Sequence, residues 1–141
     1  MRIPHEVLVV VRRGRSYLVL HRAPAYEAYW HLVSGGVEAG ESAREAALRE
    51  LEEEVGLAPE ALVDLGRRFA YPLAEESEWV RSRYAPDVAE VVVDCFLADA
   101  GGAWEPVLNE EHDDYRWCAA ADAASLLFWP EPRELVLELA S

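Results

Sequence analysis

Lysine is absent from this chain of 141 residues, and all 13 basic side chains are arginine. The 27 acidic side chains outnumber them, which gives a formal net charge of −14. This balance argues against binding to long nucleic acid, which requires a basic surface. It does not exclude a small phosphorylated ligand, because a bound metal ion and a few arginines reverse the charge locally and arginine pairs well with phosphate.

Cysteine and long hydrophobic runs are also scarce. The two cysteines, Cys95 and Cys118, form no C-x-x-C pair and lie in separate apolar runs. We therefore expect two buried, reduced thiols rather than a disulfide or a metal site. The apolar run at residues 7–11 is too short to cross a bilayer, and no segment has the layout of a signal peptide. These features predict a soluble, cytoplasmic protein.

The length and the hydrophobic content favour one folded unit. Hydrophobic residues make up 52% of the chain, which excludes a disordered protein. A chain of about 150 residues buries roughly 70% of the surface that it exposes when unfolded, so a core can form without disulfides. We therefore predict a single domain that spans residues 1–141.

Short apolar and β-branched runs, separated by turn residues, predict a series of strands. Helices are predicted at residues 120–127 and 131–140, and an earlier helix follows the third strand. Strands on both sides of an early helix, with helices at the end, indicate a mixed sheet covered by helices, an α/β or α+β sandwich. The predicted strands are residues 6–12, 16–22, 30–34, a part of 62–73, 88–98, 104–108 and 115–118.

The early helix has recognisable ends. Ser42 is a favourable N-cap, and Glu45 stands three residues later, which is the capping-box pattern. Gly56 suits the position that ends a helix. Leu48 and Leu51 are expected to share an apolar face that points away from most of the carboxylates and packs on the sheet.

Three glutamates of this helix form the most unusual feature of the sequence. Glu50, Glu53 and Glu54 follow the spacing i, i+3, i+4, which places them within a sector roughly 100° wide. Like charges at this spacing destabilise a helix by a few tenths of a kcal/mol per pair. The cluster therefore indicates a positive partner, and a hard divalent cation such as Mg²⁺ or Mn²⁺ prefers oxygen ligands.

Residues 35–57 follow a fixed pattern: glycine, five residues, glutamate, seven residues, then R-E-L-x-E-E-x-G-L. This pattern resembles the Nudix box, and the predicted strand, loop and helix around it form the context that the motif requires. The resemblance implies an α/β/α sandwich that hydrolyses a nucleoside diphosphate linked to another moiety. The matching positions are Gly35, Glu41, Arg49, Glu50, Leu51, Glu53, Glu54, Gly56 and Leu57.

The resemblance also implies where a metal binds. By position, Glu50, Glu53 and Glu54 are the ligands of Mg²⁺ or Mn²⁺, and a backbone carbonyl of Gly35 or Gly36 adds a further ligand. Such ions neutralise phosphate charge and lower the pKa of a bound water. The alternative for the whole stretch is a solvated acidic helix.

Other residues of the motif are expected to position the ligands. The resemblance implies an ion pair between Glu41 and Arg49 that fastens the loop to the helix and orients Glu50. His31 and His112 are isolated histidines in the sequence, and we expect structural roles for both.

A narrower resemblance extends beyond the motif. Residues 30–41 (W-H-L-V-S-G-G-V-E-A-G-E), 83–86 (R-Y-A-P) and 111–117 (E-H-D-D-Y-R-W) are similar to a bacterial branch of the family. That branch includes dihydroneopterin triphosphate pyrophosphatase and dATP pyrophosphohydrolase-like proteins. The similarity covers most of the chain.

Four residues take roles from this second resemblance. Glu111 is implied to approach the metal from a late loop, the alternative being a solvated residue of an acidic segment. Arg2, Arg22 and Ser34 are implied to contact substrate, with the arginines on phosphate oxygens. The alternative for Arg22 is a surface arginine at the end of a strand.

The longest irregular segment, residues 74–87, combines aromatic and basic side chains. Trp79, Arg81 and Arg83 are candidates for stacking on a base or pterin and for holding phosphate. The alternative is that the aromatics pack the segment onto the sheet, which we favour for Tyr84 and leave open for Trp79.

These expectations lead to a Mg²⁺-dependent hydrolysis of a nucleoside or pterin triphosphate to its monophosphate and pyrophosphate, by attack of water on phosphorus. Glu50 is the first candidate for the general base and Glu111 is the alternative. A second interpretation changes the substrate to ADP-ribose or another nucleotide-linked diphosphate, because Pro72 resembles a feature of such family members. A third is a non-catalytic nucleotide sensor. The resemblance also allows a homodimer.

Overall fold

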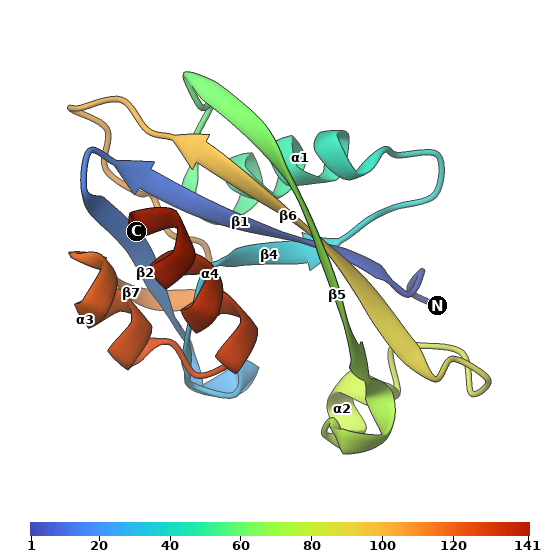
Figure 1. Cartoon of the computed structure of the whole chain (residues 1–141). Coiled ribbons are helices and arrows are strands. Elements are labelled where there is room, and N and C mark those ends of the chain that lie inside the picture. The colour runs from blue at the N-terminus through green and yellow to red at the C-terminus, as the bar shows by residue number, and fades with distance from the viewer.

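Seven strands form one mixed sheet in the computed structural model, which describes all 141 residues (Figure 1). The strand order is β3-β2-β1-β6-β5, with β4 paired to β1 and β7 paired to β2. Only β1 and β6 run parallel, and all other pairs are antiparallel. The strands are β1 (His5–Arg13), β2 (Ser16–Arg22), β3 (Trp30–His31), β4 (Val33–Gly36), β5 (Ala61–Pro72), β6 (Glu90–Asp99) and β7 (His112–Cys118).

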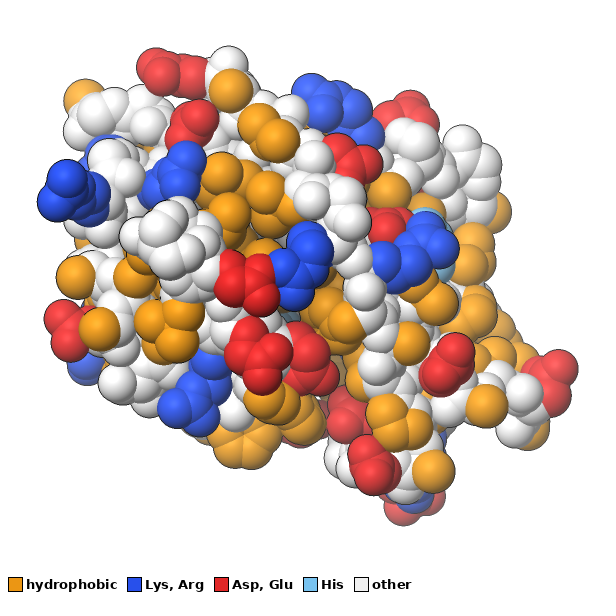
Figure 2. Space-filling model, in the orientation of Figure 1, with side chains coloured by type: hydrophobic (Ala, Val, Ile, Leu, Met, Phe, Trp, Pro, Cys, Tyr) orange, Lys and Arg blue, Asp and Glu red, His pale blue; other side chains and the backbone are white.

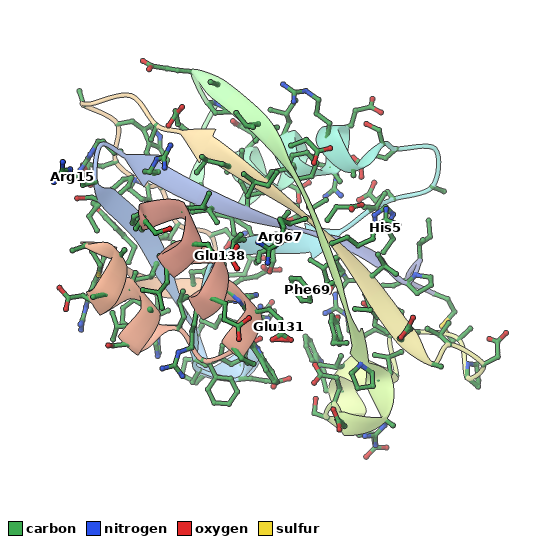
Figure 3. All side chains as sticks on the ribbon, viewed as in Figure 1. His5, Arg15, Arg67, Phe69, Glu131 and Glu138 are labelled. Atoms are coloured by element: carbon green, nitrogen blue, oxygen red, sulfur yellow. The ribbon has the colours of Figure 1, made fainter.

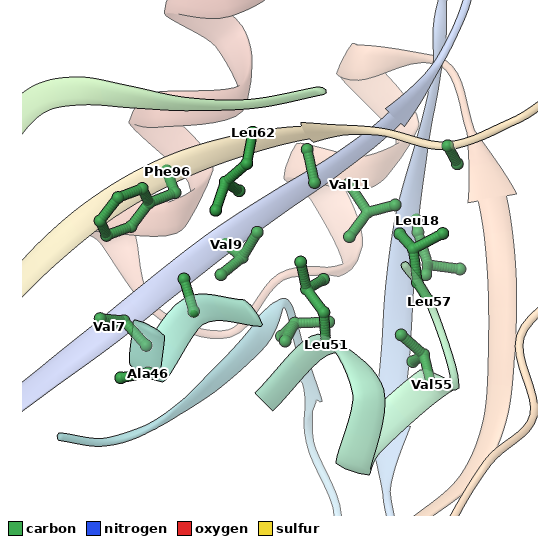
Figure 4. Close-up of a cluster of buried hydrophobic side chains, with 14 of the residues drawn as sticks. Val7, Val9, Val11, Leu18, Ala46, Leu51, Val55, Leu57, Leu62 and Phe96 are labelled. Atoms are coloured by element: carbon green, nitrogen blue, oxygen red, sulfur yellow. The ribbon is translucent and has the colours of Figure 1, made fainter. Parts of the chain in front are cut away.

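Helices cover both faces of this sheet, which confirms the predicted sandwich. Alternate residues of β1 point to opposite faces, so Val7 and Val9 pack under α1, whereas Leu8 and Val10 pack under α3 and α4. Figure 4 shows the first of these layers, with Leu51 of α1 facing the valines of β1. The helices are α1 (Ala43–Val55), α2 (Glu78–Arg81), α3 (Ala120–Leu126) and α4 (Pro130–Ala140).

Helix α1 begins and ends as predicted. The Ser42 hydroxyl accepts a hydrogen bond from the backbone of Glu45, whose carboxylate accepts one from the backbone of Ser42. Gly56 closes the helix with a φ of 70°, a left-handed conformation that glycine adopts without strain.

The predicted apolar face of α1 is partly wrong. Leu48 is 40% exposed, whereas Leu51 is fully buried. A helix turns about 100° per residue, so the buried sector around Leu51 extends toward Glu50 and Glu54 rather than toward Leu48. The two carboxylates therefore belong to the face that packs on the sheet, and both are buried.

Residues 104–108 were predicted as a short strand, and this is also wrong because the segment has no regular structure. The backbone N–H of Val107 donates to the carbonyl of Val55 at the end of α1 rather than to a neighbouring strand. The indole of Trp104 donates to the carbonyl of Gly56. The segment thus satisfies its polar groups on the helix terminus and has no strand beside it.

Strand β1 changes one of its neighbours along its length. It pairs with β4 over its first half, from Glu6 to Val9, and with β2 only at Arg12 and Arg13. Beyond that point β2 continues away from β1 and pairs with β3 and β7. The sheet therefore divides between Val9, which pairs with the first residue of β4, and Arg12, which pairs with Tyr17 of β2 beside the last residue of β7.

The remaining expectations concern cysteines and membranes. Both cysteines are free thiols; Cys95 is buried as expected, which raises its pKa to about 11, whereas Cys118 is only partly buried. None of the helices has the length and apolar character needed to cross a membrane.

Candidate active site

Arg49 fastens the loop before α1 to the helix itself. Its guanidinium donates to both oxygens of Glu41, at 2.8 and 2.9 Å, and to the carbonyl of Gly36 at 2.7 Å. The remaining nitrogen donates to Glu50 at 2.8 Å and to Glu53 at 3.2 Å. The hydrogen bonds from Arg49 lower the pKa of Glu41 to about 2. One planar cation thus sets the orientation of the loop and of the Glu50 carboxylate.

The Glu50 carboxylate also rests on the backbone of Gly35. A Cβ atom at position 35 would lie only 2.1 Å from the Glu50 carboxyl carbon, so no residue but glycine leaves the carboxylate in this place. Gly36 has its carbonyl occupied by Arg49. Burial raises the pKa of Glu50 in spite of Arg49 beside it.

Glu54 lies deeper and meets two residues from the late loop. One ligand atom from each of Glu54, Glu111 and His112 lies within 4.8 Å of the others. Glu54 is 2% exposed, and its Oε2 is shielded from solvent without a hydrogen-bond partner. Burial, together with the neighbouring carboxyl of Glu50, raises the pKa of Glu54 well above its usual range. Glu54 therefore lies beside the Glu111 carboxylate with no arginine in an ion pair with either of them, whereas Arg49 pairs with Glu50.

His112 does not supply this missing charge. Its Nε2 lies 3.8 Å from the Glu54 carboxylate. Burial, with the positive charge of Arg22 as a second cause, lowers the pKa of His112 to about 4. The imidazole is thus neutral near pH 7.

The position of Glu111 is set by its backbone. The Glu111 carbonyl accepts from the N–H of Ala23, at 2.8 Å, and its own N–H donates to the side chain of Asn109 at 3.1 Å. The Asn109 amide also donates to the carbonyl of Glu53 in α1. Asn109 therefore links the late loop to the helix that carries the other carboxylates.

Glu53 stands apart from this cluster. Its side chain is 55% exposed and lies on the outer side of α1, beside Arg49. The three glutamates that the helical spacing grouped together are thus divided by burial: Glu50 and Glu54 face inward and Glu53 faces outward. Glu53, Glu50 and Arg49 line a shallow surface depression.

A cleft of about 430 Å³ adjoins the cluster, and Glu50 and Glu111 form part of its wall. Three arginines, at positions 2, 22 and 83, and Ser34 line the same cleft. Arg2 is held by Glu6 at 3.3 Å, and Arg22 donates to the carbonyl of Tyr26 at 2.8 Å. The structure therefore gathers the predicted phosphate-contacting residues around one cavity, despite the net negative charge of the chain.

Residues 74–87 were predicted to be irregular, which is partly wrong because they include α2, and they contribute unequally to this cleft. Trp79 is 44% exposed and lines the cleft with the Arg83 guanidinium 4.7 Å from its ring. Arg81 does not line it and instead donates to the carbonyl of Glu76. Tyr84 is buried against Leu73, which agrees with the packing role that the sequence favoured.

Several residues of the cleft and cluster were not identified from the sequence. His112 joins the acidic cluster, although the sequence suggested only a structural role. Tyr29, six residues before the motif, also lines the cleft, as do Trp129 and Glu131, more than 70 residues after it. The only sequence signal for His112 was its place directly after Glu111, and no spacing pattern marks the other three.

The donor set fits a hard divalent cation. Such ions bind carboxylate oxygens. The Oε2 atom of Glu54 is an oxygen of this kind, and no group of the protein forms a hydrogen bond with it. Glu50 and Glu111 present two more carboxylates at the cleft wall. An uncompensated buried charge costs free energy. A cation bound here would therefore offset the repulsion between these carboxylates and the cost of burying them.

Comparison with known protein families supports this arrangement. The NUDIX domain family matches residues 3–139. The chain belongs to the Nudix family. The Nudix box of this chain is thus the segment that carries Arg49, Glu50 and Glu54. Nudix hydrolases generally use divalent metal ions, which agrees with the donor set described above.

Two relatives show how far the likeness extends. The dihydroneopterin triphosphate diphosphatase of Escherichia coli strain K12 is 33% identical over 129 residues, which cover 87% of this chain and 83% of that protein. A Myxococcus xanthus protein named octanoyltransferase is 34% identical over 134 residues, or 92% of this chain. The chain spans only 35% of that longer relative.

A solved structure supports the same placement within the Nudix family. The structure of the E. coli dihydroneopterin triphosphate pyrophosphohydrolase matches with a TM-score of 0.84 and 28% identity, covering 99% of this chain and 96% of that one. The predicted resemblance to the branch that contains this enzyme is thereby confirmed.

Proposed function

We propose that this Nudix protein hydrolyses a nucleoside or pterin triphosphate to its monophosphate and pyrophosphate. The observation that carries the proposal is the buried cluster of Glu54, Glu111 and His112 beside a cleft lined by arginines. Such a cleft joins carboxylates that attract divalent cations to side chains that bind phosphate oxygens. The likeness to dihydroneopterin triphosphate diphosphatases favours a triphosphate as substrate.

Glu50, Glu54 and Glu111 would hold a divalent cation such as Mg²⁺ or Mn²⁺, with the carbonyl of Gly35 as a further ligand. Glu53 would reach the cation only from the outer depression. When bound, the ion supplies charge neutralisation for the phosphates and lowers the pKa of a nearby water.

The side chains of the cleft would do the rest of the chemistry. Arg2, Arg22 and Arg83 bind the phosphate oxygens and spread the charge that develops on them. Glu41 and Arg49 act indirectly, because they fix the direction of the Glu50 carboxylate. Their role is positioning rather than contact with substrate.

The proton of the attacking water requires a carboxylate acceptor. Glu50 remains our first candidate because it lines the cleft and burial raises its pKa, which makes it a stronger base. Glu111 lines the same cleft and remains the alternative.

A second substrate class keeps one supporting observation. Pro72, which suggested ADP-ribose or a related nucleotide-linked diphosphate, lines the cleft. The third interpretation, a non-catalytic sensor, has less support, because the carboxylates of the box are all present in the sequence.

Product identification over a substrate panel tests the proposal. The panel comprises the dNTPs, 8-oxo-dGTP, dihydroneopterin triphosphate, ADP-ribose and dinucleoside polyphosphates, each with Mg²⁺. We expect pyrophosphate from a triphosphate, and a loss of at least about 100-fold in kcat for Glu54→Gln, because a cation ligand is removed. Release of AMP from ADP-ribose alone would favour the second class. A fully active Glu54→Gln protein would refute the assignment of the cluster.

A further inference from the structure

Among the glutamates that line the cleft, Glu131 is distinguished by a carboxylate oxygen that has no partner, and neither metal nor phosphate binding explains it. Glu131 lines the cleft from the first turn of α4, and its Oε2 is shielded from solvent without a hydrogen-bond partner. It forms no ion pair with any arginine or histidine of the chain. The positive end of the helix dipole favours an acidic side chain at this position, but it leaves the oxygen unpartnered.

The surroundings of Glu131 differ from those of the acidic cluster. Phe69, Trp129 and two prolines beside Glu131 line this part of the cleft. Figure 3 shows Glu131 on α4 and Phe69 on β5, on the two sides of the space between these elements. In Figure 2, hydrophobic atoms lie at the surface between α4 and β5, with acidic and basic side chains around them. The chemistry of the walls suits a flat, largely apolar ring.

A chain of contacts connects this part of the cleft to the phosphate-binding part. Arg22 of β2 pairs with His112 of the acidic cluster, and its guanidinium carbon lies 5.3 Å from the centre of the Tyr29 ring. The Tyr29 ring in turn lies 6.1 Å from that of Trp129, in an edge-to-face arrangement. Trp129 is two residues before Glu131 in the sequence. The order along the cleft is therefore acidic cluster, Arg22, aromatic side chains and Glu131.

The type of ring follows from the hydrogen bonds that a carboxylate makes. An ionised carboxylate only accepts, and its two oxygens match two parallel N–H donors on one edge of a ring. Guanine and pterin present such an edge, a ring N–H beside an exocyclic amino group. Adenine and cytosine present an amino group beside a ring nitrogen with a lone pair, which repels the second oxygen.

From this arrangement we propose that Glu131 determines ring specificity, by accepting two hydrogen bonds from the 2-amino-4-oxopyrimidine edge of a guanine or pterin ring stacked near Trp129. The inference rests on the proposed function for the phosphate end, and it narrows the substrate to guanine and pterin triphosphates. Because Oε2 is shielded from solvent, the Glu131 carboxylate would turn toward the cleft when the ring binds, and the ligand would then supply the hydrogen-bond donors that this oxygen lacks.

The variant Glu131→Gln tests this role with little change of shape. Glutamine replaces one acceptor by an N–H donor, which faces a donor of the ring edge. A good bidentate pair discriminates between bases by roughly tenfold to 100-fold. We expect the ratio of kcat/KM for dGTP to that for dATP, and likewise for dihydroneopterin triphosphate to dATP, to fall by about this factor. Glu134→Gln, an exposed change on the same helix, should leave both ratios as they are.

Binding measurements separate this inference from the proposed function. Calorimetric titration with dGMP, neopterin monophosphate and dAMP needs no hydrolysis. If the wild-type protein cleaves no triphosphate, the proposed function fails, but a preference for dGMP or neopterin monophosphate that Glu131→Gln removes still supports the ring assignment. Two results would overturn the ring assignment. One is that Glu131→Gln leaves the kcat/KM ratios unchanged. The other is that the wild-type protein binds the three monophosphates equally, or that Glu131→Gln keeps the wild-type preference.

Discussion

The two parts of the cleft are built in different ways. The acidic part takes Glu50 and Glu54 from adjacent turns of one helix, and Arg49 of the same helix holds the first of them at 2.8 Å. The aromatic part takes Tyr29 and Trp129 from segments about 100 residues apart in the chain, which meet only in the folded protein. Local spacing thus places the helical carboxylates of the first part, to which the late loop adds Glu111 and His112, whereas the second part depends on tertiary structure throughout.

This difference separates reaction from selection. Carboxylates that are fixed on a helix keep their relative positions when the sequences of the surrounding loops change. Specificity is free to vary, because it depends on side chains from loops and helix ends. We therefore expect changes in the acidic part to affect every substrate alike and changes in the aromatic part to affect only substrates with a ring.

Among the changes that leave every carboxylate of the site in the sequence, the largest effect is expected from Gly35→Ala. The new methyl group would lie 2.1 Å from the Glu50 carboxyl carbon, and the flexible end of that side chain is what must move. Moving a catalytic group by about 1 Å costs on the order of 100-fold in rate. We expect kcat to fall by this factor for dGTP and for inorganic triphosphate alike, with little change in the midpoint of thermal unfolding.

Gly102→Ala is the matched control, because a Cβ at that position meets no atom within 4 Å. It should retain wild-type activity. An active Gly35→Ala protein would show that the position of the Glu50 carboxylate does not matter for the rate, and would break the distinction between the two parts.

The sequence predicted the acidic part better than the aromatic part, for a physical reason. The capping box and Gly56 fix the ends of α1, and the period of the helix places Glu50 and Glu54 on one side. It did not predict that Glu53 faces outward, because the spacing alone leaves all three carboxylates in one sector and only the packing of Leu51 on β1 decides which are buried.

No sequence pattern predicts the residues of the aromatic part. Trp129 is the N-cap of α4, and Glu131 lies in the first turn of that helix. Neither periodicity nor spacing relates these two residues to the Nudix box. The strand order was likewise not derivable, because the change of neighbours along β1 depends on pairings between distant segments. The fold class followed from the order of the strands and helices alone.

A smaller effect, limited to substrates that carry a ring, is expected from Trp129→Ala. Stacking of a base on an aromatic side chain contributes about 1–3 kcal/mol. We expect kcat/KM for dGTP to fall about tenfold or somewhat more, while hydrolysis of inorganic triphosphate, which has no ring, is unaffected. Leu137→Ala is the control, because that side chain of α4 is 48% exposed and does not line the cleft. Equal losses on both substrates would contradict the division.

The smallest effect at neutral pH is expected from Glu41→Gln, which weakens the paired hydrogen bonds to Arg49 while leaving Glu50 in place. Removing such a supporting contact costs about tenfold in activity, and we expect this loss in kcat for all substrates, with KM little changed. Glu52→Gln, an exposed change on α1, is the control and should behave as wild type.

The dependence of stability on pH tests whether the ion pair is the cause. The pKa of Glu41 is lowered from 4.5 to about 2 in the folded protein, so its ionised form stabilises the fold. That contribution is fully present above the unfolded pKa and is lost as pH falls through the folded pKa. In urea unfolding, the difference between wild type and Glu41→Gln should therefore be constant from pH 7 to about 5 and shrink between pH 4 and 2. A difference that stays constant down to pH 2 would mean that shape rather than charge is responsible, and that Arg49 is held by the remaining contacts of the acidic part.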